Sequence, residues 1–127
     1  NHVVQNKTPD LFVAEHLDEL TGAHHLLSND LGAASALAWR LCRSDVTLYD
    51  TRGELKYGLS YPEHSQRSVP LADIRQWLWQ ARQDGSVAVL LRINSASDRY
   101  QLALLPGDGE RYRNGNLVLA ILPQVRP

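Results

Sequence analysis

The sequence predicts an α/β domain in which helices flank a mixed β-sheet in three layers. Segments with apolar residues at helical spacing alternate along the chain with short apolar runs typical of strands. The nearly continuous apolar run VAVLLRI, residues 87 to 93, is typical of a central strand that is buried on both faces. A length of 127 residues, with 43% hydrophobic and 21% charged residues, fits one compact domain.

The first helix follows a short N-terminal segment without periodicity. We interpret residues 1 to 8 as a linker and residues 9 to 127 as a single domain. Thr8 followed by Pro9 is a typical helix start, because proline fits the first turn, where no amide donor is needed. This helix is predicted to extend to about Leu20.

The second helix, predicted for residues 31 to 42 after a strand at 24 to 27, is apolar on nearly all sides. Ser35 and Arg40 are the residues that interrupt its apolar surface. A helix of this kind is normally buried on more than one side. We therefore expect it to pack on the sheet and also against a second element or a partner.

The remaining elements complete the prediction. A third helix is expected from near Pro70 or Leu71 to Gly85, and the segment 106 to 115 is rich in turn residues. Further strands are predicted at residues 46 to 49, 54 to 61, 87 to 93, 100 to 105 and 116 to 122. Helices interleaved with strands in this order predict a Rossmann-like three-layer sandwich.

The charge distribution argues against a nucleic-acid partner. The chain holds 13 basic and 14 acidic residues and has a net charge of −1, without a clustered stripe of Lys and Arg along the sequence. Lys7 and Lys56 are the two lysines, so the cations are mostly Arg. Guanidinium groups bind phosphate well, so the Arg residues are compatible with contact to phosphorylated lipid. The alternative is that the source genome simply uses Arg in preference to Lys.

We find no catalytic or metal-binding set and predict no cofactor. His24 and His25 are adjacent, so on a strand their side chains are expected on opposite faces. Cys42, near the end of a mostly apolar helix, is expected to be a small buried hydrophobe. An independent enzyme would need a nucleophile with a base, and none is recognisable.

Two sets of residues remain as candidate sites. The turn with Ser28, Asn29, Asp30 and Gly32 follows a strand and opens a helix, where backbone amides hold either an anion or a capping side chain. The second set contains aromatic residues that pack at the edge of the core or form an interface. Its members are Trp39, Tyr57, Tyr61 and Trp79.

The chain contains no Met, and no run approaches about 18 apolar residues. We therefore interpret it as a fragment of a longer protein.

Several stretches resemble one family of membrane enzymes. They are SNDLGAASALAWRLCRSDVTLYD at residues 28 to 50, GELKYGLSYP at 53 to 62, Trp77-Leu78 with Gln80 and Arg82-Gln83, and NLVLAILP at 116 to 123. Together they are similar to the C-terminal periplasmic region of bacterial undecaprenyl phosphate-aminoarabinose:lipid A aminoarabinosyltransferases, membrane glycosyltransferases of the GT-C type. The resemblance spans about residues 9 to 123.

The resemblance implies a function for the parent protein. The parent would transfer 4-amino-4-deoxy-L-arabinose from undecaprenyl phosphate to lipid A in the inner membrane, which gives resistance to polymyxin and other cationic peptides. This periplasmic domain would be noncatalytic, because no residue here matches the family's catalytic acid, and would cap the membrane-embedded part of the same polypeptide. The alternative is a stand-alone periplasmic module that holds a small anion at the turn from Ser28 to Gly32.

Overall fold

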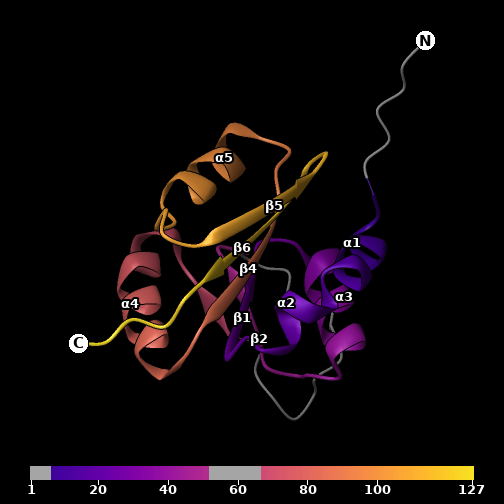
Figure 1. Ribbon diagram of the computed structural model, residues 1–127. Coiled ribbons are helices and arrows are strands. Elements are labelled where there is room, and N and C mark those ends of the chain that lie inside the picture. The colour runs from indigo at the N-terminus through magenta and orange to yellow at the C-terminus, as the bar shows by residue number, and fades with distance from the viewer. Residues whose placement is uncertain (1–6, 52–66) are drawn as a thin grey trace.

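The computed structural model describes residues 7 to 51 and 67 to 127. In this part of the chain, helices cover both faces of a six-stranded mixed sheet, so the predicted three-layer α/β class is confirmed (Figure 1). The helices are α1 (Pro9–Glu15), α2 (Leu17–Thr21), α3 (Leu31–Leu41), the 3-10 helix η2 (Leu71–Asp73), α4 (Ile74–Asp84) and α5 (Ala96–Ala103). The strands are β1 (His25–Ser28), β2 (Val46–Tyr49), β3 (Ser68–Val69), β4 (Val87–Arg92), β5 (Glu110–Asn114) and β6 (Leu117–Leu122).

The sheet changes its direction of growth between β1 and β4. Its strand order is β3-β2-β1-β4-β6-β5, and β3, β2, β1 and β4 are parallel. β6 runs antiparallel to both β4 and β5. The chain thus builds outward on one side of β1 through β2 and β3, then crosses to the other side to form β4. In open α/β sheets, this switch point is where a crevice forms at the carboxyl ends of the strands.

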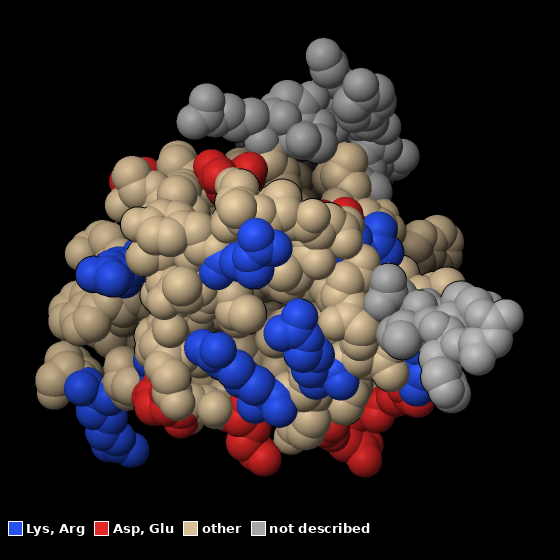
Figure 2. Space-filling view, turned by 90° about the horizontal axis from the view of Figure 1, so that it is seen from above, with Lys and Arg blue, Asp and Glu red and all other residues tan. Residues whose placement is uncertain are grey.

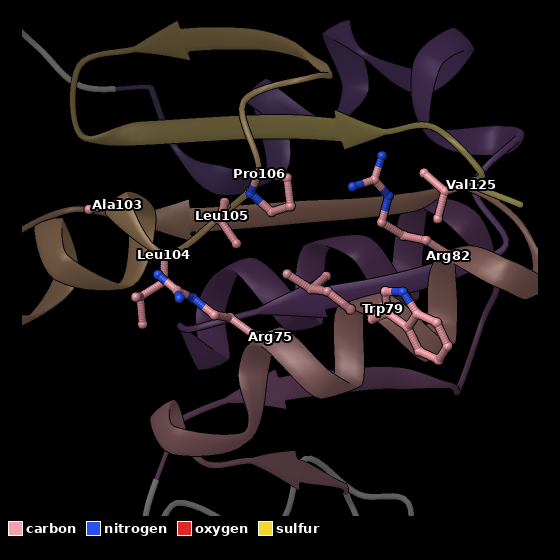
Figure 3. A pocket seen from close by; sticks show the side chains of 9 residues that line it. Arg75, Trp79, Arg82, Ala103, Leu104, Leu105, Pro106 and Val125 are labelled. Carbon is pink, nitrogen blue, oxygen red and sulfur yellow. The ribbon is translucent and has the colours of Figure 1, made fainter. Parts of the chain in front are cut away.

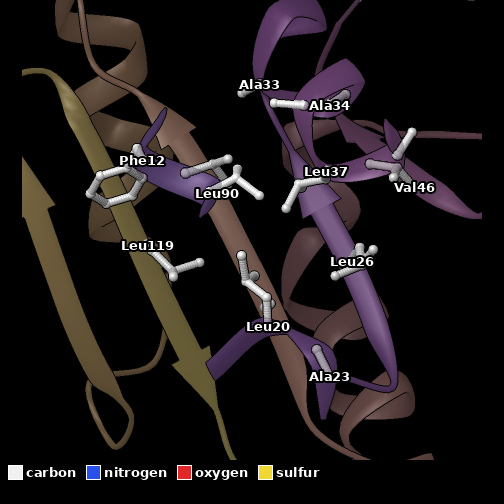
Figure 4. Close-up of a cluster of buried hydrophobic side chains, with 14 of the residues drawn as sticks. Phe12, Leu20, Ala23, Leu26, Ala33, Ala34, Leu37, Val46, Leu90 and Leu119 are labelled. Atoms are coloured by element: carbon white, nitrogen blue, oxygen red, sulfur yellow. The ribbon is translucent and has the colours of Figure 1, made fainter. Parts of the chain in front are cut away.

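Alternation along the strands divides the core in two. Leu26 of β1 joins the cluster beneath α1, α2 and α3, where Phe12, Leu20 and Leu37 are fully buried (Figure 4). The next residue, Leu27, joins the cluster beneath α4 on the opposite face. Successive side chains of a strand point to opposite faces, so a strand covered on both sides is apolar throughout.

The helix α3 is buried on two sides, as its composition predicts. It packs on β1, β2 and β4 and also against α1 and α2. Arg40 of α3 donates hydrogen bonds to the Asp10 carboxylate of α1 through Nε at 2.9 Å and Nη2 at 2.6 Å. The second element expected beside this helix is therefore α1 of the same chain.

The predicted first helix is interrupted at His16. Thr8 caps α1, because its Oγ1 accepts a hydrogen bond from Leu11 N, but His16 leaves the helical region with φ −117° and ψ 26°. The His16 ring lies 4.7 Å from the rings of both Phe12 and Tyr112. Contacts with a distant strand thus accompany a break that the helical spacing did not indicate.

Two predictions for the C-terminal half were wrong. The segment 100 to 105, predicted as a strand, is mostly part of α5, which begins where Ser95 Oγ accepts a hydrogen bond from Asp98 N at 3.1 Å. The turn-rich segment 106 to 115 contains β5, which pairs with β6 across a turn where Gly115 has φ 57°. The strand predicted at 54 to 61 lies outside the described residues. Within residues 7 to 51 and 67 to 127, no helix has the length and apolar character needed to cross a membrane.

Candidate functional site

The turn predicted to hold an anion or a cap lies at the switch point of the sheet. Ser28 ends β1 and Arg92 ends the neighbouring strand β4, so the residues that follow both strands meet at one edge. This edge is the usual place for a ligand in an open parallel sheet. Asn29 and Asp30 follow β1 directly at this edge.

The Asn29 side chain joins three separate elements. Its Nδ2 donates to the backbone oxygen of Arg92 at 3.0 Å and to Oε1 of Gln101 at 2.7 Å. Its Oδ1 accepts a hydrogen bond from the Arg92 backbone N–H at 2.8 Å. Gln101 lies on α5 and is only 4% exposed. Asn29 therefore fastens the end of β1 to β4 and to α5, and this use of its amide competes with ligand binding.

The Asp30 side chain caps α3. Its Oδ2 accepts a hydrogen bond from Ala33 N at 2.9 Å, so the capping interpretation is confirmed for this residue. A Cβ placed on Gly32 would lie 3.1 Å from the same oxygen. The carboxylate thus occupies the space over the first turn, where the helix dipole favours negative charge. Anion binding at this turn stays a prediction, and an added anion would have to share the site with Asp30.

Among the residues that the structure describes, two polar side-chain atoms at the carboxyl ends of the strands are buried and have no hydrogen-bond partner. They are Nε of Arg92 and Oγ1 of Thr51. Nη1 of Arg92 lies 3.7 Å from Oδ2 of Asp30, so the guanidinium faces the capping carboxylate. Close by, the Tyr49 hydroxyl donates to the Gln101 backbone oxygen at 3.1 Å, and burial raises the pKa of this hydroxyl well above its usual value.

Arg92, Gln101 and Tyr49 are site residues that the sequence patterns did not indicate. Gln101 was placed in a predicted strand, and Arg92 was hidden in the apolar run of β4. A charged residue that ends a buried strand was the one signal available, since side chains at strand ends meet at the sheet edge.

The fold also gathers cations that are dispersed in the sequence. Figure 2 shows Lys and Arg side chains spread over the face seen from above, the side on which α5 and β5 lie in Figure 1, with Asp and Glu toward its margins. Exposed cations come from separate elements of the described chain; Arg99, for example, is exposed and lies on α5. The absence of a basic stripe along the chain therefore did not predict this surface.

A family model described as "Arabinosyl transferase ArnT, C-terminal domain" matches residues 4 to 121 of the chain. The chain belongs to this family. The resemblance noted in the sequence is thereby confirmed, and the matched range contains the switch point and both core clusters except Leu122.

Curated relatives agree with this assignment. The chain is 98% identical over all 127 residues to an undecaprenyl phosphate-alpha-4-amino-4-deoxy-L-arabinose arabinosyl transferase of Pseudomonas aeruginosa strain LESB58. It is 53% identical over 125 residues to a transferase of the same name, numbered 2, from Pseudomonas fluorescens strain Pf-5. The first match covers 100% of the chain and 23% of the relative. The second covers 98% of the chain and 21% of the relative. It therefore spans less than a quarter of the length of these relatives. No solved structure matches it.

In this member of the ArnT C-terminal domain family, two of the candidate interface residues are exposed. Trp39 on α3 is 83% exposed and Trp79 on α4 is 55% exposed. Tyr57 and Tyr61 lie outside the described residues. Exposed tryptophans are enriched at protein interfaces, so Trp39 and Trp79 remain candidates for contact.

Two expectations for reactive side chains were wrong. Cys42 is exposed, because it ends α3 in the left-handed conformation with φ 54°, and its Sγ lies 3.9 Å from the Trp39 oxygen. The rings of His24 and His25 do not diverge: their centroids are 4.9 Å apart, since His24 precedes β1 and strand alternation does not apply to it. His25 Nε2 lies 3.3 Å from Oδ2 of Asp84. The described residues hold no group of three or more His, Cys, Asp or Glu placed to bind a metal.

Proposed function

We propose that this chain is the noncatalytic C-terminal domain of a membrane glycosyltransferase. The observation that carries the proposal is the 98% identity, over the full 127 residues, to the aminoarabinose transferase of Pseudomonas aeruginosa. The reaction we propose for the whole protein is transfer of 4-amino-4-deoxy-L-arabinose from undecaprenyl phosphate to lipid A. Covering lipid A phosphates with an amino sugar lowers the negative surface charge, and this weakens the binding of cationic peptides such as polymyxin.

The geometry of the candidate site is consistent with a noncatalytic role for this domain. At the edge where open α/β sheets bind ligands, Asn29 and Asp30 are engaged with Arg92, Gln101 and the first turn of α3. The chain covers 23% of the matched transferase. In this proposal, the catalytic groups lie in the remainder of the transferase, outside this domain. We place the domain on the periplasmic side of the inner membrane, over the membrane-embedded part of the same polypeptide.

The exposed surface supplies candidates for this contact. α1 covers the outer side of α3, so the docking surface is reduced to what remains exposed on that helix, chiefly Trp39. The face rich in Lys and Arg suits a position beside phosphorylated lipids (Figure 2). Nucleic acid is not among the partners we propose.

The test is a deletion in the parent protein. A transferase that lacks the residues equivalent to 9 to 127 is expressed in a strain without its own copy, and aminoarabinose on lipid A is measured by mass spectrometry. We expect a strong loss of aminoarabinose from lipid A although the truncated transferase is present in the membrane in normal amounts. Normal aminoarabinose levels in a well-expressed truncation would contradict the proposal.

A point variant with a matched control and a sequencing experiment complement the deletion. Trp39→Ser in the full-length transferase tests the contact residue, and Gln76→Ser on the exposed surface of α4 is its matched control. Sequencing upstream of Asn1 tests the architecture, since a series of apolar spans of about 20 residues is expected there. A nearby start codon with a simple signal peptide would instead favour a stand-alone module that binds a small anion.

A further inference from the structure

A pocket of about 350 Å³ lies between α4 and the segment that ends α5 (Figure 3). Its walls are mainly apolar, and the C-terminal tail closes one side. The apolar lining residues are Leu78, Ala103, Leu104, Leu105, Pro106 and Val125. This volume lies within the range of about 300 to 1,000 Å³ found for small-molecule sites.

Arg82 holds one wall of the pocket in place. It is 5% exposed, its Nε donates to the Pro123 oxygen at 2.8 Å, and its Nη2 bonds the Asp108 carboxylate. The Arg82 backbone oxygen accepts a hydrogen bond from Val125 N at 2.9 Å. The tail is thereby tied to α4, and the charge of Arg82 is balanced by Asp108. A preformed wall lowers the ordering cost of binding.

Arg75 is the cation left over for a ligand. It lines the pocket from the first turn of α4, is exposed, and makes no hydrogen bond or ion pair with any residue that the structure describes. Figure 3 shows its side chain reaching toward Leu104. No Asp or Glu is among the described residues that line the pocket. The pocket thus joins an apolar wall to one unbalanced guanidinium.

Trp79 adds an aromatic surface to this arrangement. It follows Arg75 by four residues on α4, so both side chains lie on one side of the helix, and it is 55% exposed although it lines the pocket. A half-exposed indole beside an apolar wall provides a large contact area for an aliphatic group.

We propose that this pocket binds a single-chain amphiphile with an anionic head group. The aliphatic chain lies against Leu78, Leu105 and Pro106, and the head group is held by Arg75, whose planar guanidinium can donate two hydrogen bonds to a phosphate or carboxylate. This inference is independent of the proposed transferase function, since it follows from the pocket residues alone.

Decyl phosphate below its micellar concentration is the probe. The 127-residue chain, whose two core clusters are built from its own residues, is labelled with ¹⁵N and titrated while amide shifts are recorded. We expect saturable shifts confined to residues 75 to 82, 103 to 106 and 125. Inorganic phosphate and the neutral decyl glucoside, each at the same concentrations, are expected to bind at least tenfold more weakly.

Matched variants test the assignment of Arg75. Arg75→Gln is expected to weaken decyl phosphate binding about tenfold, as for loss of a charge-assisted hydrogen bond. Arg99→Gln removes an exposed cation of α5 that does not line the pocket. This variant should therefore bind decyl phosphate with the same affinity as the unchanged chain. Trp79→Ala is a second exposed variant and should also weaken binding, with a native-like spectrum.

Three results would overturn the inference. Shifts located elsewhere on the chain would mean that the pocket is not the site. Equal affinity for decyl glucoside and decyl phosphate would remove the anionic head group from the proposal. Binding by Arg75→Gln within twofold of the unchanged chain would show that Arg75 does not hold the ligand.

Discussion

Replacing Asn29 by Ala should destabilise the fold more than its position on a turn indicates. The change removes three hydrogen bonds, to Arg92 N at 2.8 Å, Arg92 O at 3.0 Å and Gln101 Oε1 at 2.7 Å. At a net value of about 1 kcal/mol each, their loss costs about 3 kcal/mol. Domains of this size have about 5 to 15 kcal/mol of stability in total, so the loss is a large fraction of it.

Urea unfolding followed by far-UV circular dichroism measures this loss directly. We expect a lower urea midpoint with an unchanged dependence of the free energy of unfolding on urea concentration. In thermal unfolding, we expect Tm to fall by roughly 10 °C, at about 3 to 5 °C per kcal/mol for a chain of this length. Gln76→Ala, on the exposed surface of α4, is the control and should change stability by less than about 0.5 kcal/mol. A loss below about 1 kcal/mol for Asn29→Ala would refute the reasoning, because it would mean that water replaces the amide without cost.

The other predictions concern the turn before β5. Gly109→Ala should destabilise the fold by about 2 kcal/mol or more, because a Cβ there would lie 2.0 Å from the Ile121 oxygen; Gly107→Ala is its control, since a Cβ at that position meets no atom within 4 Å. Urea unfolding measures both variants. The Arg82 guanidinium holds the pKa of Asp108 below its usual value, so this ion pair stabilises the fold above about pH 4 and the contribution is lost as the pH falls through the lower folded-state pKa. Asp108→Asn should therefore reduce the loss of stability with acid in urea titrations below about pH 4, and an unchanged acid limb would contradict this.

Elements with a strong apolar period were predictable from the sequence. α3 occurs at Leu31–Leu41 and β4 at Val87–Arg92, close to the predicted ranges, because each buries the residues that its own periodicity brings together. The apolar character of α3 on several sides also predicted its burial against a second element. The identity of that element, α1, required the structure.

Elements held by distant partners were not predictable. β5 has the sequence ERYRN, which is polar because it is an edge strand with much of its surface exposed, and pairing with β6 makes it a strand. α5 lacks a strong apolar face, and its buried Gln101 is placed by Asn29, 72 residues away in the chain. In both cases the element depends on a contact with another segment, and the local sequence pattern does not show that contact.

The sequence by itself determined the α/β class, a helix cap within the turn from Ser28 to Asp30 and the resemblance to the arabinosyl transferase family, because periodicity, capping and motif similarity are local properties. The tertiary structure decided which residues meet. It brought Asn29 to Arg92 across 63 residues, gathered dispersed cations on one face, and formed the pocket between α4 and the end of α5. These arrangements depend on the order of strands in the sheet, and strand order is set by burying both faces of the sheet at once, which no single segment encodes.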